Sequence, residues 1–136
     1  MSDRYTVDVH VRYQDLDTMA HVNNAVYATY LEEARAAYAR DVLDLEVEDY
    51  SFVIARLEIA FERPVTMTDE LQVAIETTAL GESSTTMAYE LLVEGETVGT
   101  GETTLVFVDP DKKQPAPIPT AIRERIVAFE DLEGGE

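Results

Sequence analysis

Apolar and polar residues alternate one by one near the start of the chain. From Tyr5 to Tyr13 the odd-numbered positions are Tyr or Val, and the even-numbered positions are polar. Because side chains along a strand point alternately to its two faces, this pattern predicts a half-buried strand with Tyr13 on the inner face. From Gln14 to about Val22 the alternation is lost, and we expect a loop.

The spacing becomes helical from Asn23 or Asn24 to about Leu43. Apolar residues recur three and four positions apart, which is typical of one face of an amphipathic helix. Six alanines in the same segment favour a helix and keep it slim. Either asparagine can serve as the N-cap. The apolar stripe consists of Val26, Tyr27, Tyr30, Leu31, Ala34, Tyr38 and Val42.

Four further segments read as strands, at 51–62, 70–80, 83–93 and 97–108, and Glu94-Gly95-Glu96 joins the last two as a hairpin. After a turn and a proline-rich stretch, a short helix is expected from Thr120 to about Phe129. One long helix among five strands excludes a doubly wound fold. The order predicts an α+β fold in one domain, residues 1–136. In it, a five-stranded antiparallel sheet wraps around a helix that is buried on most sides.

The charge of the chain limits its partners. Its 136 residues include 28 acidic and 10 basic side chains, and the net charge is −18. The acids are dispersed and only Lys112 and Lys113 are lysines, so nucleic acid and anionic membranes would repel the protein. No apolar run reaches the roughly 18 residues of a membrane-spanning helix, and the N-terminus lacks the apolar block of a signal peptide. We therefore expect a cytoplasmic protein. The absence of cysteine excludes disulfides and thiolate chemistry.

The junction between the first strand and the long helix concentrates the chemistry. It holds Asp15, Asp17 and His21, followed by Asn23-Asn24. From Thr18 to Leu31 there is no Asp, Glu, Lys or Arg, so no side-chain charge offsets the positive end of the helix. Its unpaired N–H groups are then available to an incoming oxygen. A buried helix start that merely avoids charge is the alternative.

The junction also carries a longer motif, Tyr13-x-Asp15-x-Asp17-x-x-x-His21-Val22-Asn23-Asn24-x-x-Tyr27-x-x-Tyr30-x-x-Glu33-x-Arg35, and Val106-Phe107-Val108-Asp109 follows near the end. Together they resemble the hotdog-fold acyl-CoA thioesterases of the 4-hydroxybenzoyl-CoA thioesterase type. The resemblance covers nearly the whole chain. It implies a hotdog fold, hydrolysis of an acyl-CoA to the free acid and CoA, no cofactor, and a homodimer or homotetramer with sites at the subunit interface.

The resemblance also implies roles for individual residues. Asp17 would attack the thioester carbonyl or activate a water to do so. Backbone N–H groups near Asn23 and Asn24 would stabilise the oxyanion, and loss of one such donor typically costs about 3 kcal/mol. His21 would either contact the substrate or bond Asp17 or the backbone. Tyr27 and the helix start would line the acyl chamber.

Recognition of the thiol carrier has less support in the sequence. Coenzyme A is a polyanion, and the predicted substrate contacts besides Tyr27 are Arg63 and Ser83-Ser84. The family often places basic residues after a glycine at the start of the strand that carries these serines. This chain has the acidic Glu82 after Gly81 there. Another thioester carrier therefore stays open.

Other assignments of the same residues are also open. Other branches of the hotdog superfamily place the catalytic carboxylate on the central helix, which makes Glu32 and Glu33 rivals of Asp17. A metal site is not expected, because the junction has a single histidine and no second one nearby. A non-catalytic hotdog module that binds an acyl group or serves in assembly is one alternative function. A hydratase with Asp17 and His21 as base and acid is another.

Dispersed acid with almost no lysine also predicts adaptation to high salt, because salt screens the self-repulsion of a net charge of −18. We expect the free energy of unfolding to rise from low to molar KCl, measured by denaturant titration at each salt concentration. A stability that does not rise with KCl would contradict this prediction. An acidic tail that binds a cationic partner is the alternative, and it has only Glu130, Asp131, Glu133 and Glu136.

Overall fold

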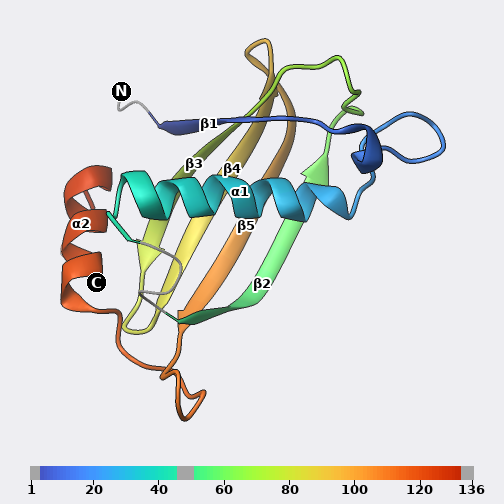
Figure 1. Ribbon diagram of the computed structural model, residues 1–136. Coiled ribbons are helices and arrows are strands. Elements are labelled where there is room, and N and C mark those ends of the chain that lie inside the picture. The colour runs from blue at the N-terminus through green and yellow to red at the C-terminus, as the bar shows by residue number, and fades with distance from the viewer. Residues whose placement is uncertain (1–3, 46–50, 133–136) are drawn as a thin grey trace.

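The computed structural model describes residues 4–45 and 51–132 (Figure 1). The predicted order of helices and strands is confirmed, and each boundary after the first loop lies within a few residues of its expected position. Glu133 and Glu136 of the acidic tail lie outside the described residues. The elements are β1 (Tyr5–Val9), the 3-10 turn η1 (Tyr13–Asp15), α1 (Val26–Asp41), β2 (Phe52–Phe61), β3 (Leu71–Leu80), β4 (Ser84–Val93), β5 (Glu96–Phe107) and α2 (Thr120–Glu130).

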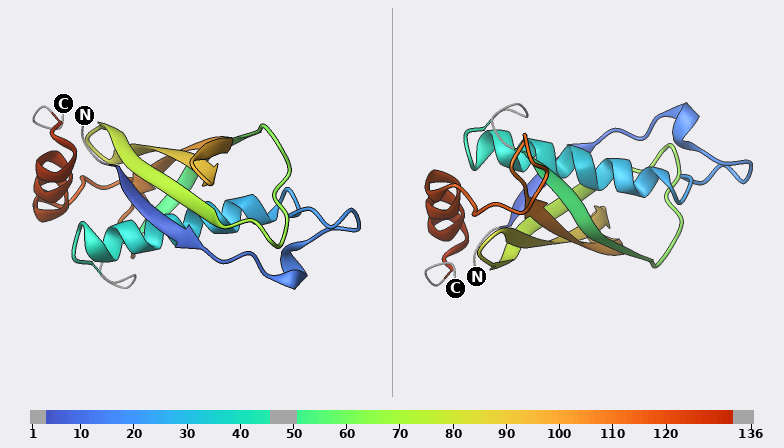
Figure 2. Two further views of the ribbon diagram at one scale, coloured as in Figure 1. Left: turned by 90° about the horizontal axis from the view of Figure 1, so that it is seen from above. Right: turned by 90° about the horizontal axis from the view of Figure 1, so that it is seen from below.

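All neighbouring strands are antiparallel, and their order in the sheet is β1-β3-β4-β5-β2. The first strand after α1 therefore lies at one edge of the sheet, paired on a single side with β5. Views from above and below show α1 along one face of the twisted sheet and α2 near the C-terminal end of α1 (Figure 2). This arrangement confirms the predicted α+β hotdog fold.

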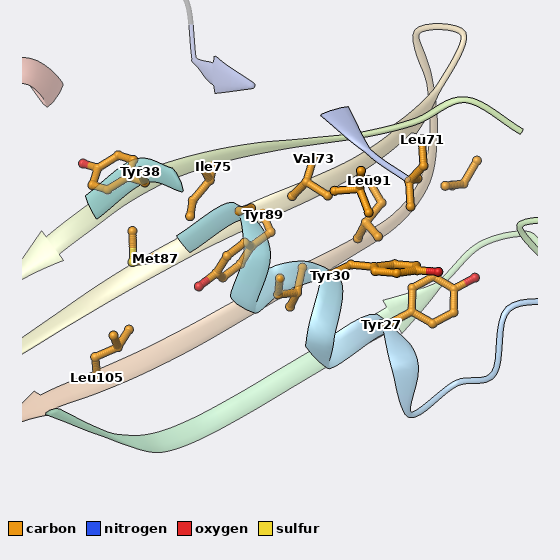
Figure 3. Close-up of a cluster of buried hydrophobic side chains, with 14 of the residues drawn as sticks. Tyr27, Tyr30, Tyr38, Leu71, Val73, Ile75, Met87, Tyr89, Leu91 and Leu105 are labelled. Atoms are coloured by element: carbon orange, nitrogen blue, oxygen red, sulfur yellow. The ribbon is translucent and has the colours of Figure 1, made fainter. Parts of the chain in front are cut away.

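The core lies between α1 and the sheet face that it covers. Side chains of β4 alternate between buried and half-buried along the whole strand, as expected for a sheet covered on one face. Tyr30 and Leu31 of the predicted stripe are almost completely buried. Figure 3 shows Tyr30 in one cluster with Val73 and Leu91 of the sheet. The stripe predicted from the sequence is therefore the face that packs on the sheet.

The packing is tight where α1 crosses β5, at Gly101. A Cβ atom built on Gly101 would lie 2.9 Å from Cδ1 of Leu31, which is closer than real Cβ atoms come to other carbons. The glycine thus lets the helix approach the strand.

The prediction that the first strand continues to Tyr13 is wrong. The strand ends at Val9, and Tyr13 is 78% exposed in the 3-10 turn. The reason is a side-chain hydrogen bond that the alternation does not reveal, because the backbone N–H of Arg12 donates to the carboxylate of Asp15 (3.0 Å). That bond turns the chain where an alternating strand would continue.

The start of α1 also differs from the prediction. Its N-cap position is Ala25, which offers no side-chain cap, so neither Asn23 nor Asn24 is the N-cap. The side chain of Asn23 acts just before the helix instead, where Oδ1 accepts the N–H of Ala25 (2.8 Å). The two asparagines thus mark the approach to the helix, and the helix itself begins later than predicted.

The helix α1 is buried on most sides, as predicted, since ten of its sixteen residues are buried or half-buried, and one stripe on its outer face is exposed. Arg35, Ala37 and Ala39, which are not part of the predicted stripe, are buried as well. No helix in the described ranges is long and apolar enough to cross a membrane. The exposed residues of α1 are Thr29, Glu32, Glu33, Ala36, Arg40 and Asp41.

Leu31→Ala should lower the free energy of unfolding by about 2–5 kcal/mol, because it leaves a cavity where α1 meets β5. Thr29→Ala is the matched control on the open face of the same helix, and it should change stability by less than about 0.5 kcal/mol. Denaturant unfolding measures both. Equal effects of the two variants would contradict this packing of α1 on the sheet.

Candidate active site

Asp17 lies in a closed turn between the 3-10 turn and α1. The N–H of Asp17 donates to the carbonyl of His21 (2.7 Å), and the N–H of Ala20 donates to the carbonyl of Asp17 (3.0 Å). Oδ1 of Asp17 accepts the backbone N–H groups of Met19 (2.8 Å) and His21 (3.2 Å). Oδ2 has no hydrogen bond within the described residues. One carboxylate oxygen therefore shapes the turn, and the other is open to solvent or substrate.

Backbone hydrogen bonds hold this turn against its surroundings. Leu16 and Val22 form a two-residue antiparallel bridge on either side of it. The N–H of Val22 donates to the carbonyl of Val65 (2.8 Å), which ties the turn to the segment after β2. The N–H of Asn23 donates to the carbonyl of Asp15 (2.8 Å). The Asn23 N–H is therefore already used and cannot serve as the predicted oxyanion donor.

The following N–H groups show which donor is available. The N–H of Ala25 donates to Oδ1 of Asn23 (2.8 Å), and the N–H of Val26 donates to the carbonyl of Asn23 (2.9 Å). The N–H of Tyr27 donates to the carbonyl of Asn24 (3.4 Å). The N–H of Asn24 has no acceptor among residues 4–45 and 51–132. Of the two backbone N–H groups predicted to stabilise the oxyanion, only that of Asn24 is therefore available.

A cavity of about 240 Å³ brings most of the predicted site residues together. The residues that line it come from the turn, the start of α1 and the end of β2. The ring of Tyr27 forms one wall, edge-on to Phe61 with ring centroids 4.9 Å apart. Burial raises the pKa of the Tyr27 phenol, so the wall is uncharged. The lining residues are Asp17, His21, Val22, Asn24, Tyr27, Phe61, Glu62, Arg63 and Pro64.

Arg63 lies at this cavity but is paired with acids. Its guanidinium lies 3.4 Å from the carboxylate of Glu96 and 3.8 Å from that of Asp69, and it donates to the carbonyl of Pro64 (3.2 Å). Two carboxylates offset its single charge, so Arg63 alone provides little attraction for a phosphate.

Ser83 and Ser84 are not brought to the cavity within one chain. Ser84 pairs with Val106 of β5, and Val106 pairs with Val53 at the start of β2. The cavity lies at the other end of β2, beside Phe61. The two serines therefore lie at the opposite end of the sheet from Asp17.

The rival carboxylates on α1 lie in a different hollow. Glu32 and Glu33 line a groove of about 530 Å³ between α1 and the start of β2. This groove is larger than the cavity at Asp17, but the first residues of α1 do not line it. Glu32 lies 3.8 Å from Arg35, and Glu33 lies 3.9 Å from Arg12. Both carboxylates are exposed and lie near arginines.

Sequence reasoning missed one polar contact beneath the site. The sequence places Tyr30 in the apolar stripe only, yet its O–H donates to the buried carboxylate of Asp15 (2.7 Å). A signal was available, because a fully buried tyrosine hydroxyl usually needs a partner. Phe61 and Glu62 were also missed as lining residues, and no sequence signal links them to the turn.

The described residues contain no group of three or more His, Asp or Glu side chains placed to hold a metal ion. Asp15 turns inward to Tyr30, away from the open carboxylate oxygen of Asp17 and from His21. Asp15 is therefore not placed to share a ligand with Asp17 and His21.

Comparisons with known proteins identify the family of the chain. The chain belongs to the thioesterase-like superfamily, which matches residues 11–126. The long-chain acyl-CoA thioesterase FadM of Escherichia coli (strain K12) is 26% identical over 123 residues, which are 87% of this chain and 93% of FadM. The uncharacterized protein YsmA of Bacillus subtilis (strain 168) is 34% identical over 103 residues, which are 74% of this chain and 69% of YsmA.

A solved structure also resembles this chain. A thioesterase from Thermus thermophilus, crystallised with coenzyme A and Zn, is 41% identical with a TM-score of 0.85, over 93% of this chain and 94% of that one. The chain is thus a hotdog-fold protein close to acyl-CoA thioesterases.

Proposed function

We propose that this protein is an acyl-CoA thioesterase that hydrolyses the thioester to a free acid and CoA. One observation carries the proposal: the open carboxylate oxygen of Asp17 and the free N–H of Asn24 belong to residues that line the same cavity. The similarity to FadM and to the coenzyme A-bound Thermus thioesterase supports acyl-CoA as the substrate class.

In the proposed mechanism, Asp17 acts on the carbonyl carbon while the carbonyl oxygen lies at the N–H of Asn24. As a nucleophile, Asp17 forms an acyl anhydride, the C–S bond breaks, and water then cleaves the anhydride. As a general base, Asp17 takes a proton from the attacking water, and the thiolate leaves directly. Both routes develop negative charge on the carbonyl oxygen, which the Asn24 N–H and the positive end of α1 stabilise.

The remaining cavity residues have supporting roles in this proposal. The main-chain N–H of His21 holds Oδ1 of Asp17, and its imidazole would contact the substrate in the cavity that His21 lines. Tyr27 and Phe61 offer an uncharged aromatic wall to the acyl group. Cytoplasmic location and salt adaptation stay predictions.

We further propose that the active unit is a homodimer paired through β2. This strand has no neighbour on its outer side in the described chain, and open edges pair readily with another strand. Four of its large apolar side chains are between 41% and 51% exposed. Antiparallel pairing would bring the start of the second copy's β2, with its Ser83-Ser84 end, toward the cavity. The exposed residues are Val53, Ile54, Leu57 and Phe61.

We expect thiol release from one or more members of an acyl-CoA panel at high KCl, followed with a thiol reagent. Asp17→Asn should abolish turnover, because an amide neither attacks nor takes a proton. Glu33→Gln, a matched carboxylate-to-amide change on α1, should keep most of it. The reverse result would move the catalytic carboxylate to the helix.

The same assay separates the alternative functions. Binding of acyl-CoA by the wild type without thiol release would indicate a non-catalytic module. Hydration of a 2-enoyl-CoA without thiol release would indicate a hydratase.

The dimer should have about twice the chain mass of 15.2 kDa in light scattering. Leu57→Asp places a charge on the β2 edge and should yield monomer, because pairing would bury that charge. Thr6→Asp adds the same charge on the exposed face of β1, at the other edge of the sheet, and should leave the dimer intact. A monomeric wild type, or dissociation by both variants, would contradict pairing through β2.

A further inference from the structure

A buried carboxylate lies two residues before Asp17, outside the cavity. Asp15 is only 5% exposed and is absent from the residues that line the cavity. Its Oδ2 accepts the O–H of Tyr30 (2.7 Å) and the backbone N–H of Arg12 (3.0 Å), and Nε of Arg12 lies 3.6 Å away. Asp15 is thus fastened to α1 by Tyr30 and to its own turn by Arg12.

These contacts keep Asp15 charged although it is buried. Burial acts to raise the pKa of the carboxyl group, but the hydrogen bonds from Arg12 and Tyr30, together with the charge of Arg12, hold it below the ordinary value. An ionised carboxylate makes stronger hydrogen bonds than a neutral group, so the anchor is firm.

The main chain of Asp15 reaches both proposed reacting groups. Its carbonyl accepts the N–H of Asn23, and the next N–H along the chain is the free one of Asn24. In the other direction a single residue, Leu16, separates Asp15 from Asp17. Leu16 also forms the bridge to Val22 that closes the turn. A shift of Asp15 would therefore move the Asp17 carboxylate and the Asn24 donor relative to each other.

We propose that Asp15, held by Tyr30, is a positioning residue that sets the distance between the carboxylate of Asp17 and the N–H of Asn24. The proposal rests on the thioesterase activity proposed above. Asp15 does not touch the substrate and takes no part in proton transfer. A misplacement of about 1 Å at a reacting centre can cost about a hundredfold in rate, so such an anchor has a large kinetic effect.

The test compares kcat and KM of three variants with an acyl-CoA that the wild type hydrolyses. Asp15→Ala removes the anchor and should lower kcat about a hundredfold while KM changes less than about threefold. Asp15→Asn keeps one oxygen that can accept both the Arg12 N–H and the Tyr30 O–H, so kcat should stay within about tenfold of the wild type. Tyr30→Phe removes one of the two bonds, and its kcat should fall between those of the other two variants.

A matched control separates positioning from stability. Thr77 is 2% exposed, and its hydroxyl is bonded to that of Tyr38 (3.0 Å) near the other end of α1. Thr77→Val should lower the melting temperature and leave kcat within about twofold. If Asp15→Ala is poorly folded, the comparison of Tyr30→Phe with Thr77→Val at matched stability decides the question.

Several results would overturn the proposal. A kcat near the wild-type value in Asp15→Ala or Tyr30→Phe, with only the melting temperature lowered, would assign Asp15 to stability alone. An Asp15→Asn variant as inactive as Asp17→Asn would make Asp15 a proton-transferring group. A wild type that releases no thiol would refute the proposed function itself, whereas an inactive Asp17→Asn beside fully active Asp15 variants would refute only the positioning role.

Discussion

The close packing of α1 on the sheet is the constraint on which the other features depend. Leu31 can approach β5 because Gly101 has no side chain there. With the helix held at that distance, Tyr30 points inward and its hydroxyl reaches Asp15. The start of α1 then lies beside the turn that carries Asp17 and beside the end of β2. A helix packed elsewhere would carry the same residues without forming the cavity.

The site follows from how backbone hydrogen bonds are distributed around this helix start. A helix always begins with N–H groups that lack partners within the helix. Here the carbonyl of Asp15 accepts the N–H of Asn23, and the side chain of Asn23 accepts the N–H of Ala25. The N–H of Asn24, between them, has no acceptor among the described residues. Asp17 shows the same division within one side chain, since one oxygen shapes the turn and the other is open. The structural role of Asp17 in the turn is therefore compatible with the catalytic role proposed for it.

Three parts of the single chain have no partner or lie apart from the cavity among the described residues. The outer face of α1 is exposed, the β2 edge has no neighbour in the described chain, and Ser83-Ser84 lies far from the cavity. In the proposed dimer, antiparallel pairing of two β2 edges would cover this edge and bring the Ser83-Ser84 end of the second copy toward the cavity. It would also surround a site in a very acidic protein with groups from both copies. If the proposed dimer forms, the composition of one chain alone says little about the thiol carrier.

The sequence by itself determined the order of helices and strands, the buried stripe of α1 and the motif that contains Asp17, because side-chain periodicity and local motifs depend on neighbouring residues. It placed the first strand's end four residues too late, since the bond between the Arg12 N–H and Asp15 cannot be read from alternation. Only the tertiary structure decided that β2 lies at the sheet edge and that Phe61 and Arg63 meet Asp17 at the cavity. It also decided that Asn24, rather than Asn23, keeps a free N–H. These outcomes depend on contacts between segments far apart in the chain, which local patterns do not encode.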